Sequence, residues 1–110
     1  MAILRDLDRE HKKHNKPRET KIIDGAAVTF SDMVVHQFRI GDVEDPVLYA
    51  AQPISEWQQS EAGKFVMEHA VEPPWWVRTV DAATYGFEFA IVARMKESDQ
   101  TFYTLKWGSR

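Results

Sequence analysis

The stretch HAVEPPWWVRTVD, residues 69–81, decides how this chain is divided. Its two prolines end a helix, because the residue before a proline avoids the α region and the first proline restrains the second. The residues that follow, WWVRTV, are predicted to form a strand. Successive side chains of a strand point to opposite faces, so Trp75 and Trp76 cannot both face the same layer. One of them is expected in the core, and the other on the far face of a sheet.

The segment before this stretch, residues 53–70, is predicted to be the main helix. Ile54, Trp57 and Phe65 fall on one stripe at helical spacing, which indicates an amphipathic helix with one buried face. Gly63 lies inside it and lowers helix stability by about 1 kcal/mol relative to alanine. The residues leave three alternatives for Gly63: a close packing contact, a kink, or a break between two shorter helices.

The remaining elements upstream are short. Residues 26–30 are predicted to form a strand and residues 31–32 a turn. Residues 33–40 alternate with period two, which is the strand signal, and place Val34, His36, Phe38 and Ile40 on one face. A short helical segment is expected at residues 46–52, where Asp45 precedes a proline at the first helical position.

The C-terminal third is predicted to be a meander of strands. Residues 75–80 form the first, and residues 87–95 alternate strictly and form the second. The polar residues 96–100 have the length of a hairpin loop. Residues 101–107, TFYTLKW, are expected to return as the last strand.

The order arm, β, β, α, β, β, β predicts an α+β fold. We expect an antiparallel sheet of about five strands, with one main amphipathic helix packed on one face. Residues 1–22 contain seven Lys and Arg against four Asp and Glu, although the whole chain has a net charge of −3. We therefore divide the chain into a basic N-terminal arm, residues 1–21, flexible or helical, and a single α+β domain, residues 22–110.

Composition limits the classes of protein that this chain can belong to. The 110 residues are 44% hydrophobic and contain no cysteine, which excludes a disulfide framework and a thiolate metal site. No apolar run approaches the ~20 residues that span a bilayer, and the N-terminus does not have the pattern of a signal peptide. We expect a cytoplasmic protein that does not contact a membrane.

No motif indicates catalysis, and we expect neither an enzyme nor a bound cofactor or metal. His11 and His14 have a spacing that can hold a metal, but a solvated arm is favoured. His36 is expected as a core or edge histidine, and His69 as a charge at a helix C-terminus. The acidic residues 42–45 lack the spacing of a calcium loop. No serine has the surroundings of a hydrolase nucleophile, and no phosphate-binding loop is present.

Aromatic residues suggest a binding surface instead. A sheet with aromatics on both faces offers more than one helix can cover, and an uncovered aromatic patch marks an interface. We predict that a protein partner, or a second copy in a homodimer, docks there, with the basic arm ordering on contact. The alternative is a core packed on both faces of the sheet. The predicted partner-binding residues are Trp75, Trp76, Tyr103, Trp107, Arg94, Lys12 and Lys13.

Single-stranded nucleic acid is the second hypothesis for a partner. Bases stack on aromatic side chains beside a basic strip, and the arm and the C-terminal segment supply basic residues. The acidic body of the chain repels phosphate and weakens this hypothesis.

Residues 34–108 resemble small uncharacterised proteins of tailed bacteriophages. The resemblance rests on VEDPVLYAAQPISEW, on GKFVMEHAVEPPWW and on a C-terminal segment that ends LKWG. It implies a phage origin, and a role either as a virion component or as a protein that binds a host enzyme in the host cytoplasm. It implies no catalytic residues.

Overall fold

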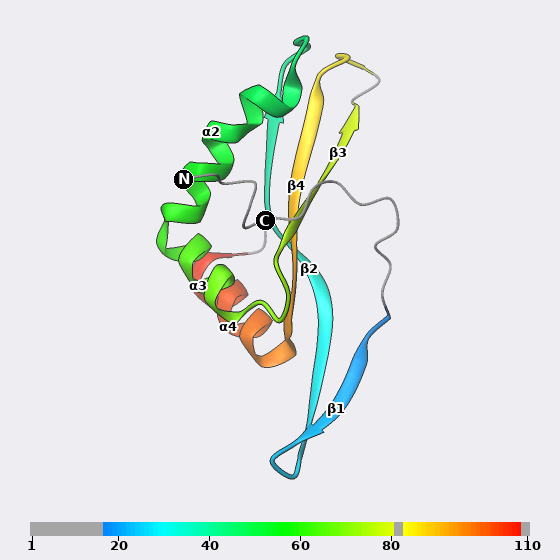
Figure 1. Cartoon of the computed structure of the whole chain (residues 1–110), viewed down its shortest axis with the longest axis vertical. Coiled ribbons are helices and arrows are strands. Elements are labelled where there is room, and N and C mark those ends of the chain that lie inside the picture. The colour runs from blue at the N-terminus through cyan, green and yellow to red at the C-terminus, as the bar shows by residue number, and fades with distance from the viewer. Residues whose placement is uncertain (1–16, 81–82, 109–110) are drawn as a thin grey trace.

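The computed structural model describes residues 17–80 and 83–108. Four strands and three helices lie within these residues, and Figure 1 shows the helices together on one side of a curved sheet. The chain is therefore α+β, as predicted, with fewer strands and more helices than expected. The elements are β1 (Glu19–Ile23), β2 (Ala26–Ile40), α2 (Pro46–Gln59), α3 (Glu61–His69), β3 (Trp75–Val80), β4 (Phe87–Lys96) and α4 (Glu97–Trp107).

The sheet is antiparallel throughout, with the strand order β1-β2-β4-β3. The longest strand is β2, which pairs with β1 at its start and with β4 along the rest of its length. Its register with β4 shifts at Val35, which is an extra residue and forms a β-bulge. The bulge places His36 and Phe38 opposite Ile91 and Phe89, while Val34 faces the other side of the sheet. The expected alternation from Val34 to Ile40 was therefore wrong at Val34.

The helices cover one face of the sheet, here called the inner face, and the core lies between them. Phe89, Ile91 and Met95 of β4 are fully buried there, together with Ile54 of α2 and Val66 of α3. The other face of β4, here called the outer face, carries the alternate residues. No helix of the described residues is long and apolar enough to cross a membrane.

The predicted main helix is two helices that meet at Ser60. The Ser60 side chain accepts a hydrogen bond from the Gly63 N–H at 3.1 Å and so caps α3. The first helix, α2, begins at Pro46 after Asp45, as predicted, and continues through Pro53. A side chain at Gly63 would place its Cβ only 1.8 Å from the Trp57 carbonyl oxygen. Gly63 therefore serves a close packing contact, and the break lies three residues before it.

The predicted last strand, residues 101–107, is wrong, because these residues belong to helix α4. The residue types of segment 101–107 favour a strand, but the residues at the two ends of α4 carry the signals of a helix. Glu97 and Asp99 lie in the first turn and Lys106 in the last turn, where each charge is favourable for the helix dipole. Gly108 follows the helix with a positive φ of 86°. Tyr103 and Trp107, four residues apart, then pack against the core.

Two further boundaries differ from the prediction. Residues 31–32 are not a turn, since β2 runs through them, and both side chains accept hydrogen bonds from neighbouring elements. Residues 19–21, assigned above to the arm, belong to β1. Of the rest of the arm, residues 17–18 lie directly before β1, and residues 1–16 lie outside the described residues.

Candidate interaction surface

The two adjacent tryptophans lie on opposite faces of the sheet, as the strand period requires. Trp76 packs on the inner face against Phe89, with ring centroids 5.4 Å apart. Trp75 lies opposite Val92 on the outer face. Their exposed fractions are only 2% for Trp75 and 4% for Trp76. Neither ring is open to a partner, so the prediction that one tryptophan would be exposed on the sheet is wrong. The alternative, aromatic residues buried on both faces of the sheet, is what the structure shows.

Tyr103 and Trp107 belong to helix α4 and not, as expected, to a strand of the sheet. Phe65 of α3 lies 5.2 Å from Phe102 and 5.6 Å from Trp107, measured between ring centroids. The Tyr103 hydroxyl is buried and donates to the Val35 carbonyl oxygen at 2.7 Å. Burial raises the pKa of Tyr103. Tyr103 therefore joins α4 to the bulge of β2, and Phe102 is the exposed ring of this cluster, at 48%.

Arg94 also has a structural role. It lies on the outer face with an exposed fraction of 4%, and its Nη1 donates to Asp32 Oδ1 at 2.9 Å. Its Nη2 donates to the Pro17 carbonyl oxygen at 2.7 Å and lies 3.6 Å from a carboxylate oxygen of Glu19. Arg94 thus joins β4 to the residues around β1 and is not available to a partner. Lys12 and Lys13, the other basic residues in the predicted set, lie outside the described residues.

The two histidines of the described chain are packed against rings. His36 stacks on Trp57 at 5.8 Å, and burial lowers the pKa of His36. His69 ends α3, where its Nδ1 lies 2.8 Å from the Phe65 carbonyl oxygen. No group of three or more His, Asp or Glu within residues 17–80 and 83–108 is arranged to hold a metal ion.

The exposed surface of the chain includes a feature that the sequence interpretation missed. The strands β1 and β2 form a ribbon that projects past the other strands (Figure 1). Asp24 and Gly25 join them, both with positive φ. A two-residue turn with positive φ matches the twist of the two strands that it joins. The sequence signal for this hairpin was therefore Asp-Gly between two strand-like segments. All five residues of β1 are exposed.

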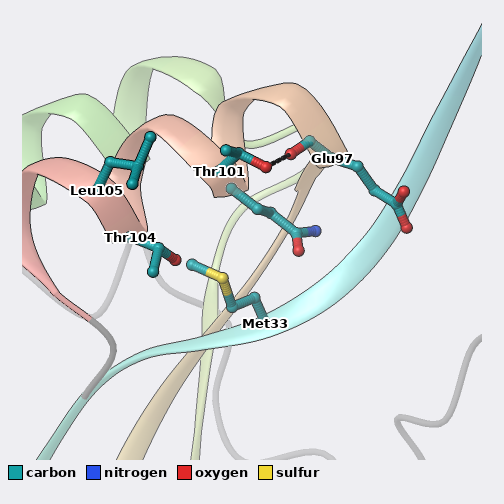
Figure 2. Close-up of a pocket in the computed structure, with 6 residues that line it drawn as sticks. Met33, Glu97, Thr101, Thr104 and Leu105 are labelled. Carbon is teal, nitrogen blue, oxygen red and sulfur yellow. Dashed lines mark hydrogen bonds between the residues drawn. The ribbon is translucent and has the colours of Figure 1, made fainter.

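A shallow trough lies where α4 crosses the inner face of β2. We call it the α4–β2 trough, and its volume is about 330 Å³. Figure 2 shows the Met33 side chain reaching from β2 toward Thr104 on α4. Leu105, 82% exposed, stands at one side of it. The lining residues are Met33, Glu97, Gln100, Thr101, Thr104 and Leu105.

Several polar groups of the trough already have partners within the chain. The Thr101 hydroxyl donates to the Glu97 carbonyl oxygen at 3.1 Å (Figure 2). The Glu97 carboxylate pairs with Arg18 at 2.7 Å. The Gln100 side-chain amide donates to the carbonyl oxygens of Ser31 and Met95 and so ties α4 to β2 and β4. These bonds fix the polar side chains of the trough within the chain, and Met33 and Leu105 supply its apolar contacts.

Comparison with known proteins adds no family to these observations. No protein-family model, curated protein or solved structure matches this chain.

Proposed function

We propose that this protein is a non-enzymatic protein–protein interaction module that binds its partner at the α4–β2 trough. The observation that supports this proposal most directly is Leu105, which is 82% exposed beside the half-buried Met33. An apolar side chain of a partner, inserted between Met33 and Leu105, removes both from water. The expected gain is about 25 cal/mol per Å² of apolar surface covered. The partner is therefore a protein segment that presents an exposed apolar residue.

The chemistry of the trough supports binding more than catalysis. A catalytic site needs a nucleophile or an acid–base pair directed at a substrate. Here the Thr101 hydroxyl is bonded to the backbone, and the Glu97 carboxylate is paired with Arg18. If the phage resemblance holds, the partner is a host enzyme or a virion component.

The experiment is a capture assay from bacterial lysate with tagged wild-type protein and two matched variants. Leu105→Glu places a charge in the trough. Leu48→Glu places the same charge on α2, where Leu48 is 67% exposed. We expect a protein that is captured by the wild type and by Leu48→Glu, and that is lost with Leu105→Glu.

Nuclease treatment separates this proposal from the nucleic-acid hypothesis. A captured protein that survives nuclease and depends on Leu105 supports the trough. Capture that disappears with nuclease, or that both variants retain equally, contradicts it.

A further inference from the structure

The outer edge of β1 is a second exposed feature, and it is independent of the trough. β1 ends the strand order, so within the described residues only β2 pairs with it. All five of its residues are exposed. An edge strand presents backbone N–H and C=O groups that can pair with another strand. The short turn at Asp24 and Gly25 and the long partner strand β2 hold this edge in an extended form.

The charges on β1 distinguish between the registers in which two copies can pair. Glu19 and Lys21 share the outer face, while Thr20 and Ile22 share the inner face. Antiparallel pairing around a two-fold axis places residues of the same face opposite each other. An axis at Lys21 sets lysine against lysine, which is unfavourable. An axis at Ile22 sets Lys21 against Ile23 of the second copy and provides no acid for it.

The register with the two-fold axis at Thr20 brings opposite charges together. It places Glu19 opposite Lys21 of the second copy, and it does so twice because of the symmetry. Opposite charges in directly facing positions stabilise strand pairing. The side chains of Glu19 and Lys21 are 50% and 57% exposed, so both can face a second chain, while Glu19 Oε1 also lies 3.6 Å from Arg94 Nη2. Within one chain, Lys21 Nζ and Glu19 Oε2 are 3.9 Å apart, so each charge can come closer to an opposite charge on a second chain.

We propose that two copies of this chain pair along β1, antiparallel, with Thr20 on the two-fold axis. The two sheets then continue as one sheet across the dimer. The paired segment is short, because β1 has only five residues and the turn at Asp24 and Gly25 follows it directly. The dimer is therefore weak, and it dissociates on dilution. This inference does not depend on the proposed function, since the trough lies on the inner face beside α4.

The charges permit a reciprocal test by sedimentation over a range of protein concentrations. The wild type is expected to dimerise as concentration rises. Glu19→Lys alone and Lys21→Glu alone place like charges opposite each other and remain monomeric. An equimolar mixture of the two variants restores the opposite pairs and forms a heterodimer. Lys64→Glu, an exposed charge reversal on α3, keeps the wild-type behaviour. Failure of the mixture to associate, or dimerisation of either single variant, overturns the proposal.

The absence of cysteine from the sequence allows a second measurement that does not depend on charge. Facing residues of antiparallel strands have Cα atoms about 4.5–5.5 Å apart, which a disulfide can bridge. Thr20→Cys is therefore expected to crosslink two chains rapidly on mild oxidation. Ile22→Cys is the control, because its two copies lie four residues apart along the strands, roughly 13 Å. Equal crosslinking of both variants rejects this register.

The two proposals can fail separately. Leu105→Glu is expected to leave the dimer unchanged, and Lys21→Glu is expected to leave partner capture unchanged. Wild-type protein that stays monomeric at every concentration overturns the inference and leaves the trough untouched.

Discussion

Arg94 of β4 and Asp32 of β2 form an ion pair across the outer face, with 2.9 Å between Nη1 and Oδ1. The arginine is 4% exposed, and the Asp32 side chain is 17% exposed. A guanidinium at this depth needs a nearby acceptor, because an unpaired buried charge is strongly destabilising. The pair therefore holds the strand in which residues 31–32 were expected to form a turn.

Asp32→Ala is expected to lower the free energy of unfolding by about 2 kcal/mol, since it leaves Arg94 partly unpaired. Urea unfolding followed by circular dichroism measures this loss. Arg18→Ala breaks the exposed pair with Glu97 and is the control, with an expected effect below about 0.5 kcal/mol. Equal losses in both variants would mean that burial of Arg94 does not strengthen its dependence on Asp32.

Gly63→Ala is expected to lower the free energy of unfolding by about 2 kcal/mol or more, because the added carbon meets backbone that cannot move cheaply. The nearest atom is the Trp57 carbonyl oxygen, at 1.8 Å. Gly41→Ala is the matched control, since nothing lies within 4 Å of its Cβ position. Thermal or urea unfolding of the two variants decides this prediction, and a neutral Gly63→Ala would show that α2 and α3 can separate.

Tyr103→Phe removes the donor to the Val35 carbonyl oxygen and leaves that oxygen buried without this bond. The expected loss of stability is about 1–2 kcal/mol. Tyr85→Phe, at a side chain that is 68% exposed, is expected to have little effect. If the two variants unfold at the same urea concentration, the bond between α4 and the bulge is not stabilising.

The raised pKa of Tyr103 also predicts alkaline behaviour. The unfolded chain releases this proton at its ordinary pKa of 10.0, while the folded chain retains it to higher pH. The contribution of Tyr103 to stability is therefore complete below pH 10.0 and declines above it. Tyr103→Phe should show a smaller loss of stability than the wild type in this range.

His36 predicts the opposite trend at acidic pH. Burial lowers its pKa from 6.5, so the unfolded chain binds a proton that the folded chain resists. Its contribution is complete above pH 6.5 and is lost as the pH falls toward the lower folded pKa. Urea unfolding of the wild type and His36→Gln at neutral and mildly acidic pH checks this prediction. An unchanged pH dependence in the variant would assign the acid sensitivity to other groups.

The sequence by itself determined the elements whose signals are local. Helix α3 ends at His69, within one residue of the predicted end, and strand periodicity placed Trp75 and Trp76 on opposite faces. The Asp-Gly pair between residues 23 and 26 is an equally local signal, and it marks the turn between β1 and β2. The acidic first turn and the glycine after α4 were also readable, but the β-type residues of TFYTLKW outweighed them.

Only the tertiary structure decided which surfaces are open. Exposure depends on what packs over a residue, and this is a property of distant segments that one strand does not contain. Because both tryptophans are buried, the candidate interfaces are the α4–β2 trough and the edge of β1, and not an aromatic face of the sheet. The same holds for the charge of Arg94. Its residue type suggested a surface contact with a partner, but its side chain is buried and donates to Asp32 and to the Pro17 carbonyl oxygen, so it stabilises the fold.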